Sequence, residues 1–374
     1  MKCEALFGDE TISTTWVGIL PRQSQKHQGE GTTMKMTHET INQLESLRSS
    51  AGNEGRTDFR TSTAVARQPR HLMIVILLAC LVGVGGVCWL QERSLAADTK
   101  VLLEKESLYH YVRVIEENGI RRLQFRRSGL DFEESAINIH DPLDFPLHYY
   151  RLMMAAFLHC PQPRSILFVG LGGGTLPRAI HHYFPEATID AIELDPVVAD
   201  AAKTFFGFQE TPRVKVYLRD ARVQMKQFAR EKRRYDIIFL DAYRGGYIPY
   251  HLTTQEFMEL TRSLLTENGI VVSNLQPGFA SYHYQRRTLA RVFEGEWSYG
   301  RYGNVIVVSS VKPNSQTKEQ LLEVAEQLQE EKKFQFYLPE IAKMGTPGGD
   351  YVRTGPILTD DYAPTDVLRG IPQD

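Results

Sequence analysis

Three acidic residues stand at or just beyond the ends of short apolar segments, where their carboxylates could bind or deprotonate a ligand. They are Glu193, Asp220 and Asp241. A carboxylate can accept hydrogen bonds from ribose hydroxyls or from an exocyclic amine such as that of adenine. It can also take a proton from an attacking amine. A single acid at such a junction is equally suited to capping the next helix. Three acids at successive junctions favour a binding site.

A glycine-rich turn precedes these acids in residues 165–178, between an apolar run and the start of a helical pattern. Glycine accepts positive φ and lets a ligand approach the backbone, and amides at a helix N-terminus favour electron-rich groups. Glu193 follows about twenty residues later, a spacing suited to binding ribose hydroxyls. The order of strand, turn, helix, strand and acid therefore predicts a nucleoside-cofactor site; the alternative is a turn needed only for packing. The glycines of the turn are Gly170, Gly172, Gly173 and Gly174.

The elements that must position these residues follow a predicted helix at 146–159 and alternate along the chain from Ser165 onward. Short apolar strands that alternate with helices predict an α/β fold with a mainly parallel sheet covered on both faces. Ligands of such sheets bind beyond the carboxyl ends of the strands, where the glycine turn and the three acids fall. The predicted strands are 166–171, 187–194, 214–219, 235–241, 269–275 and 304–310, and the predicted helices are 146–159, 175–183, 196–206, 221–230, 254–265, 282–293 and 318–333.

A smaller β-region precedes this domain. Segments 109–115 and 121–125 alternate and are rich in β-branched and aromatic residues, which predicts two strands. Asn118-Gly119 between them predicts a hairpin turn. We therefore expect a small N-terminal β-domain at 105–145 and an α/β domain at 146–374, which the resemblance described below implies to be Rossmann-like and catalytic.

The N-terminal part of the chain has a different composition. Residues 1–70 are polar with little periodicity, which predicts disorder. Residues 72–90 carry no charge and almost match the thickness of a bilayer core, so we predict a transmembrane helix or signal anchor at 71–91. The distribution of basic residues favours an extracytoplasmic C-terminal domain of a single-pass membrane protein. Cleavage at Cys80 or after 94–97 is the alternative to an uncleaved anchor.

Composition limits the other classes of function. The chain has 374 residues and a formal net charge of −2, which gives no sign of nucleic-acid binding. Its four cysteines form no disulfide framework and show no zinc-ligand spacing, so we predict no metal. The sequence leaves the oligomeric state open, with a homodimer as one option.

Seven short segments spread over Glu106 to Leu368 together form a specific pattern: 106–109, 170–178, 192–196, 219–221, Asp241, 252–257 and 358–364. In this pattern the sequence resembles the spermidine synthase family, the polyamine aminopropyltransferases, and in particular its divergent, membrane-attached bacterial branch. The resemblance implies a seven-stranded Rossmann-like domain behind a small β-domain, and a transferase of polyamine biosynthesis.

The resemblance also implies roles for individual residues. The glycine turn would hold a sulfonium nucleoside, either decarboxylated S-adenosylmethionine or S-adenosylmethionine, with no metal. Glu193 would bind the ribose, and Asp220 with Ala221 would bind the adenine. Asp241 would orient an acceptor amine and accept its proton, because an amine with a pKa near ~10 is mostly protonated at neutral pH. Residues expected to contact the acceptor are Tyr109, Tyr150, Tyr243 and Arg244.

Several positions depart from the pattern of the family. Arg244 stands where a second acid is expected, and Gly173 stands where an acid would hold the aminopropyl ammonium group. His110 replaces a glutamine, and Tyr150-Arg151 replaces a His-Glu pair. A unit charge 4 Å away is worth ~4 kcal/mol at an effective dielectric constant of 20, so Arg244 facing the site would disfavour putrescine. The alternative for Arg244 is a solvent-facing loop position.

Three functions remain in competition at this point. The leading one is aminopropyl transfer from a sulfonium nucleoside to a small amine or other small acceptor by direct displacement. The second is methyl transfer from S-adenosylmethionine, which the loss of the acid at Gly173 favours. The third is a membrane-tethered nucleoside-binding module without catalysis, which the predicted outward topology favours.

Overall fold

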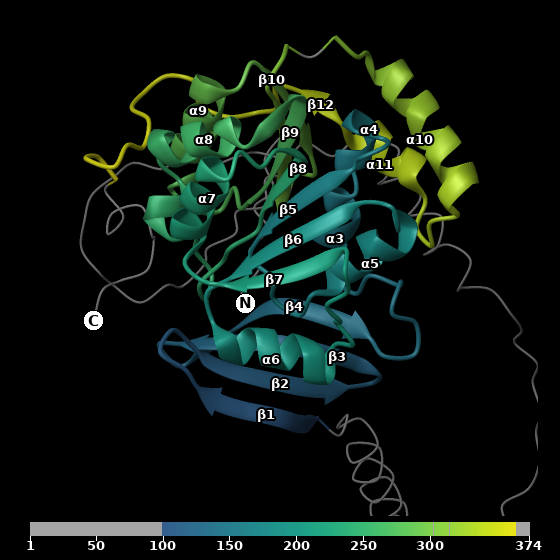
Figure 1. The fold of residues 1–374 in the computed structure, drawn as a ribbon, viewed down its shortest axis with the longest axis vertical. Coiled ribbons are helices and arrows are strands. Elements are labelled where there is room, and N and C mark those ends of the chain that lie inside the picture. The colour runs from purple at the N-terminus through teal and green to yellow at the C-terminus, as the bar shows by residue number, and fades with distance from the viewer. Residues whose placement is uncertain (1–98, 302, 314, 364–374) are drawn as a thin grey trace, which may run out of the picture. The chain divides into compact units, whose positions relative to one another are not determined.

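The computed structural model describes residues 99–301, 303–313 and 315–363. All of them belong to one compact unit, Gly85–Asp374. Figure 1 shows a small sheet and a larger sheet with helices on both of its faces. The predicted α/β fold with a small N-terminal β-sheet is therefore confirmed. The domain boundaries proposed from the sequence stay predictions.

The small sheet contains four antiparallel strands in the order β1-β2-β3-β4. The predicted hairpin turn at Asn118-Gly119 joins β2 to β3, and both residues of this turn adopt positive φ. The sheet packs its apolar face against α6 through Val112, Leu123 and Val198. Its strands are β1 (Lys100–Glu106), β2 (Tyr111–Glu117), β3 (Ile120–Arg127) and β4 (Leu130–Asn138).

The large sheet is mixed rather than mainly parallel. Its order is β12-β10-β11-β9-β8-β5-β6-β7 among the described strands, with parallel pairing from β9 to β7 and antiparallel pairing from β12 to β9. The sequence prediction missed β10, which joins β11 through a connection too short for a parallel crossover. The strands are β5 (Ser165–Val169), β6 (Thr188–Glu193), β7 (Val214–Leu218), β8 (Tyr235–Leu240), β9 (Leu265–Leu275), β10 (Gly295–Tyr299), β11 (Val305–Ser310) and β12 (Thr346–Pro347).

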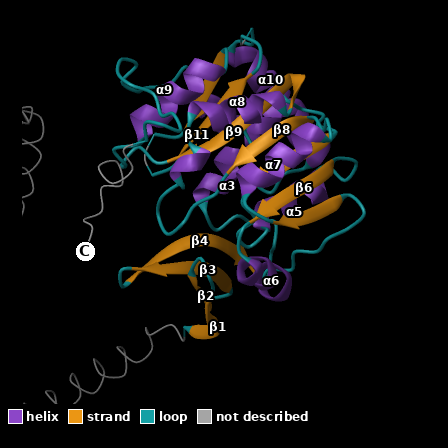
Figure 2. Ribbon diagram, turned by 60° about the vertical axis from the view of Figure 1, so that its left-hand side comes forward, coloured by secondary structure: helices purple, strands orange, loops and turns teal. Residues whose placement is uncertain are grey.

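Helices cover the two faces of the large sheet (Figure 2). The helices of each face pack on the sheet in a separate apolar cluster. One cluster joins the sheet to α3, α4, α5, α10 and α11, and the other joins it to α7, α8 and α9. Strands buried on both faces explain the continuous apolar runs in the sequence. The bounds are α3 (His148–Met153), α4 (Ala156–His159), α5 (Thr175–Tyr183), α6 (Pro196–Phe205), α7 (Ala221–Arg230), η1 (Tyr250–Leu252), α8 (Gln255–Ser263), α9 (Tyr282–Val292), α10 (Lys318–Lys332) and α11 (Leu338–Met344).

The single helix predicted at 146–159 is two short helices, α3 and α4. Near the junction, Met154 N–H donates to the Arg151 carbonyl at 3.2 Å and Phe157 N–H donates to the Met154 carbonyl at 3.1 Å. These bonds span three residues instead of four, which tightens the chain and interrupts the α-helix.

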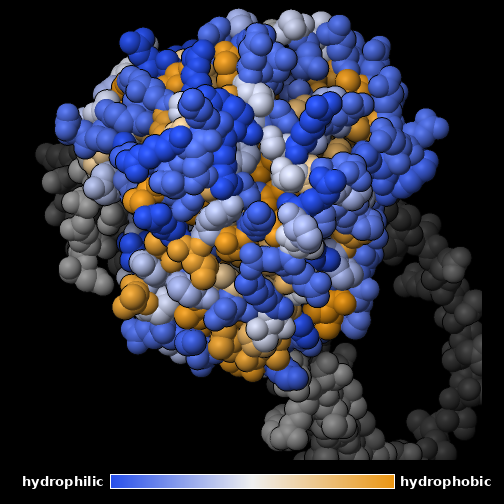
Figure 3. Space-filling model, viewed as in Figure 1, coloured by the Kyte–Doolittle hydropathy of each residue, from blue (hydrophilic) through white to orange (hydrophobic). Residues whose placement is uncertain are grey.

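The surface seen in Figure 3 is mostly hydrophilic, with apolar side chains gathered low in the view, over the region where Figure 1 places the small sheet. The exposed apolar residues of this sheet and its first loop include Val101, Leu108 and Leu130.

The structure corrects the predicted membrane localisation. In the described part of the chain, no helix is long and apolar enough to cross a bilayer. Residues 71–91, on which the prediction depended, and the segment 1–70 predicted to be disordered lie outside the described residues. The assignment as a single-pass membrane protein with an extracytoplasmic domain is therefore not retained.

Candidate active site

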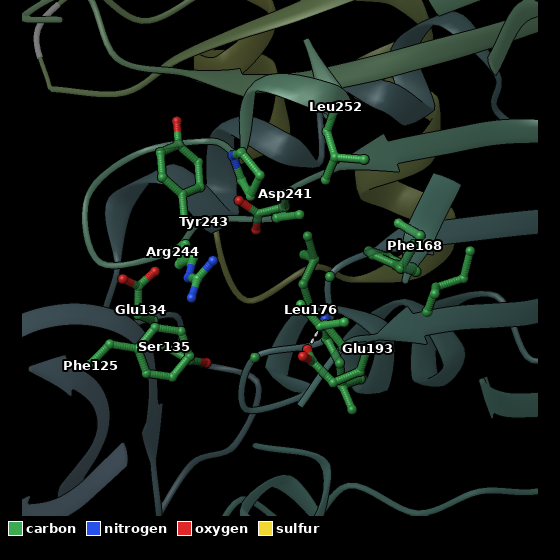
Figure 4. A pocket seen from close by; sticks show the side chains of 18 of the residues that line it. Phe125, Glu134, Ser135, Phe168, Leu176, Glu193, Asp241, Tyr243, Arg244 and Leu252 are labelled. Atoms are coloured by element: carbon green, nitrogen blue, oxygen red, sulfur yellow. Dashed lines mark hydrogen bonds between the residues drawn. The ribbon is translucent and has the colours of Figure 1, made fainter. Parts of the chain in front are cut away.

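A cavity lies between the carboxyl ends of β5, β6 and β8 and strand β4 of the small sheet (Figure 4). Its empty volume is about 930 Å³, open solvent at its mouth included. That size is within the range of small-molecule sites. The predicted site residues that line it are Tyr150, Gly170, Gly172, Glu193, Asp220, Ala221, Asp241, Tyr243 and Arg244.

The glycine turn serves two purposes. Gly170 has φ +99°, and a Cβ there would lie 2.4 Å from the carbonyl oxygen of Asp241, so only glycine fits beside β8. Gly173 and Gly174 do not line the cavity; a Cβ at Gly174 would meet the ring of Phe208 at 2.6 Å. Packing therefore accounts for the second part of the turn, while Gly170 and Gly172 face the cavity.

Glu193 ends β6 and is buried. Its carboxylate accepts hydrogen bonds from the Leu171 N–H at 3.1 Å and the Asp195 N–H at 2.9 Å. Burial raises the pKa of Glu193, and these two N–H groups act in the opposite direction. The glycine turn and Glu193, which were predicted to act together, are thus joined by a hydrogen bond.

Asp220 combines the two predicted roles of an acid at a strand end. It caps α7 by accepting the Val223 N–H at 2.9 Å, and it also lines the cavity. Its second oxygen lies 3.2 Å from His251 Nε2, and the hydrogen bond from His251 is the main cause of a lowered pKa of Asp220. Ala221 begins α7 beside it.

Asp241 follows β8 directly and faces the cavity (Figure 4). Asn274 Nδ2 donates to its Oδ1 at 2.9 Å, and the Tyr149 hydroxyl also hydrogen bonds to it. Burial raises the pKa of Asp241, while these two bonds lower it. A carboxylate with a raised pKa is a stronger proton acceptor near neutral pH.

The aromatic residues predicted to contact the acceptor differ in position. The Tyr150 hydroxyl lies 2.7 Å from Ser135 Oγ, and burial raises the pKa of Tyr150 to about 12. Tyr243 donates to the Asn274 carbonyl at 2.9 Å. Tyr109 does not line the cavity but borders the neighbouring groove, which Arg244 also lines.

Arg244 is exposed and reaches the Tyr109 carbonyl at 3.5 Å, so it stands at the boundary between the cavity and the groove. His110 occupies the same boundary. Its Nδ1 lies 3.0 Å from Asp195, and its ring stacks on Phe125 with centroids 4.0 Å apart.

Sequence reasoning missed Glu134, Tyr149 and Asn274. The pair Glu133-Glu134 is typical of an exposed strand, and Asn274 lies inside an apolar run. A polar residue within such a run is a weak signal that could have drawn attention to Asn274. The described residues hold no cluster of His, Cys, Asp and Glu suited to a metal ion.

Comparison with known proteins identifies the family. A model of the spermine/spermidine synthase domain matches residues 147–292. Polyamine aminopropyltransferase from Vibrio vulnificus is 32% identical over 304 residues, which covers 79% of this chain and 98% of that protein. The chain belongs to the spermine/spermidine synthase family. It is a transferase.

Other relatives of this family member show a wider range of chemistry. The eEF1A lysine and N-terminal methyltransferase of Bos taurus is 36% identical over 121 residues, which is 30% of this chain and 17% of that protein. Among solved structures, spermidine synthase from Thermotoga maritima has a TM-score of 0.52 at 18% identity and covers 65% of this chain and 83% of its own. That similarity supports the fold.

Proposed function

We propose that this spermidine synthase family member transfers an aminopropyl group from decarboxylated S-adenosylmethionine to a small-molecule amine. The position of Asp241 is the observation that carries the proposal. Its carboxylate shares one cavity with the glycine turn and Glu193. A proton acceptor opposite a nucleoside site is what amine alkylation by a sulfonium compound requires.

The residues of one side of the cavity suit a nucleoside, and we name them the nucleoside half. Gly170 and Gly172 offer backbone without side chains, Glu193 would accept hydrogen bonds from the ribose hydroxyls, and Asp220 with Ala221 would bind the adenine. The nucleoside half consists of Gly170, Gly172, Glu193, Asp220 and Ala221.

The opposite side, which we name the acceptor half, would bind the amine. Asp241 would attract the ammonium form and take one proton from it. The free amine nitrogen then forms a bond to the aminopropyl carbon next to sulfur, and the carbon–sulfur bond breaks with its electron pair remaining on sulfur. The products are a neutral thioether nucleoside, the alkylated ammonium and one released proton. The acceptor half consists of Glu134, Tyr149, Tyr150, Asp241, Tyr243 and Arg244.

Methyl transfer is the second candidate, and Gly173 is the observation that favours it. Glycine at this position lacks the negative charge with which an acid would repel the carboxylate of S-adenosylmethionine. The partial similarity to a lysine methyltransferase points in the same direction. Here the acceptor amine would attack the methyl carbon instead of the aminopropyl carbon.

Calorimetry with the full chain separates these functions. We expect methylthioadenosine and decarboxylated S-adenosylmethionine to bind, and product analysis with an amine to show aminopropyl transfer. Binding of S-adenosylhomocysteine with no response to the decarboxylated compound would favour methyl transfer. Failure of every nucleoside to bind would contradict both proposals.

A further inference from the structure

A β-bulge in strand β4 directs Glu134 into the cavity. In the pairing of β3 with β4, Leu123 lies opposite Ser135 and the next residue, Gln124, lies opposite Glu133. Glu134 is therefore the extra residue of the bulge. Bulges often re-aim a side chain beside a site, and Glu134 lines the cavity although its neighbour Glu133 is exposed.

The Glu134 carboxylate meets the loop that follows Asp241. Its Oε1 accepts the Gly245 N–H at 3.1 Å, and Gly246 N–H also bonds to the carboxylate. This loop carries Tyr243 and Arg244, which belong to the acceptor half. Figure 4 shows Glu134 on the side of Arg244 and away from Glu193.

Two other positions could have supplied a second acid here, and neither does. A Cβ at Gly173 would lie 2.7 Å from Ser135 Oγ and 2.8 Å from a ring carbon of Phe206, so an acidic side chain has no room there. Position 244 carries a positive charge instead. An acid from the small sheet therefore places beside Asp241 a second carboxyl group that can pair with a cationic acceptor.

We propose that Glu134 binds the ammonium group of the acceptor amine and, together with Asp241, selects cationic acceptors. The inference rests on the proposed function, because it assigns the second carboxylate of that same site. Glu134 is a binding residue in this account, and Asp241 remains the proton acceptor.

The electrostatics of the cavity agree with this role. Burial raises the pKa of Glu134 to about 8, and the nearby Asp241 adds to the increase. The carboxyl group is therefore largely protonated at neutral pH until a cation arrives, and ammonium binding should release its proton. The other titratable or charged groups that face it are Tyr149 on α3, Glu193 on β6, and Tyr243 and Arg244 after β8.

The test compares Glu134→Gln with Glu133→Gln in the full chain. The amide introduced by Glu134→Gln keeps an oxygen for the Gly245 N–H but cannot carry charge. Glu133 is the adjacent exposed acid, paired with Arg122 at 3.1 Å. Amine binding is measured by calorimetry with protein saturated by methylthioadenosine, with 1,3-diaminopropane, putrescine and cadaverine as probes. Buffers of different ionisation enthalpy report the protons released.

We expect Glu134→Gln to weaken binding of the best of these amines about 10- to 100-fold, the range for a charge-assisted hydrogen bond, and to reduce proton release. Methylthioadenosine affinity should stay within about twofold, and Glu133→Gln should behave as the wild type. Unchanged amine affinity in Glu134→Gln would overturn the inference, as would a parallel loss of methylthioadenosine affinity. If methylthioadenosine binds to the wild type but no diamine does, the inference is wrong while the nucleoside site stands. If amines bind as expected and no aminopropyl group is transferred, the proposed function fails instead.

Discussion

The nucleoside half and the acceptor half of the cavity hold their carboxylates by different means. In the nucleoside half, Glu193 and Asp220 accept backbone N–H groups from residues that follow closely in the chain or from the adjacent glycine turn. In the acceptor half, Asp241 depends on side chains of Asn274 and Tyr149, and Glu134 depends on a loop more than a hundred residues away. The first half is therefore set mainly by local chain geometry, although His251 also bonds to Asp220, and the second half is set by tertiary packing.

This difference separates stability from chemistry. Substitutions at the glycine turn strain the backbone that joins β5 to α5, so folding and nucleoside binding should fail together. Substitutions of carboxylates in the acceptor half leave the backbone in place, so they should act on the reaction and on the pH dependence of stability. The predictions below use this contrast.

Asp241→Asn should have the largest effect on the reaction. Loss of the proton acceptor is expected to lower kcat about 10²- to 10⁴-fold, with methylthioadenosine affinity retained, in assays of aminopropyl transfer. Asp236→Asn is the matched control, because Asp236 lies near the start of β8, the strand that Asp241 follows. Asp236 accepts the N–H groups of Arg164 and Ser165. It should lower stability and spare kcat. Equal kcat in Asp241→Asn and the wild type would remove Asp241 from the mechanism.

Gly170→Ala should strongly destabilise the fold. Its Cβ would enter the Asp241 backbone, in addition to the cost of positive φ, so we expect a loss of about 3 kcal/mol or more in the free energy of unfolding. Gly207→Ala isolates the cost of positive φ, since Gly207 also has positive φ but no atom lies within 4 Å of the added Cβ. Its expected cost is roughly 1–2 kcal/mol. Similar losses in both variants, measured by denaturant unfolding, would show that the close approach at Gly170 is unimportant.

Most of the nucleoside half could be predicted from the sequence, because each of its residues belongs to a local pattern. The glycine turn follows an apolar run, and Glu193 and Asp220 stand at strand ends. The structure brings these residues to one cavity, while their roles stay proposals. The same patterns assigned too many glycines to the nucleoside site, since Gly173 packs against Ser135 and Gly174 packs against Phe208.

The acceptor half was only partly predictable. Asp241 stands at a strand end, which the sequence indicates. Glu134 points into the cavity because of a β-bulge, which the alternation of polar and apolar residues cannot reveal. Asn274 reaches Asp241 because β9 pairs with β8, a long-range contact with no local signal. The antiparallel part of the large sheet was missed because β10, which pairs with β11, is only five residues long.

Glu134 should make stability depend on pH. Its pKa rises from an ordinary 4.5 to about 8 in the fold, so between these values the folded chain keeps a proton that the unfolded chain loses. The contribution of Glu134 to stability is therefore complete below pH 4.5 and is lost as pH rises through about 8. Because each pKa unit corresponds to ~1.4 kcal/mol, the loss amounts to a few kcal/mol. We expect the free energy of unfolding to decrease less between about pH 5 and about pH 8.5 in Glu134→Gln than in the wild type. Equal decreases would show that Glu134 is not the group responsible.

Arg244→Gln should have the smallest effect and should appear only in the acceptor half. Arg244 is exposed at the boundary of the cavity, so solvent screens its repulsion of a diamine, and we expect only a several-fold decrease in KM for putrescine. Arg219→Gln removes the same charge from an exposed position on the lining near Asp220. It should change KM for the nucleoside rather than for the amine. If both variants changed the amine KM alike, the cavity would respond to net charge alone, and the division into two halves would not describe its electrostatics.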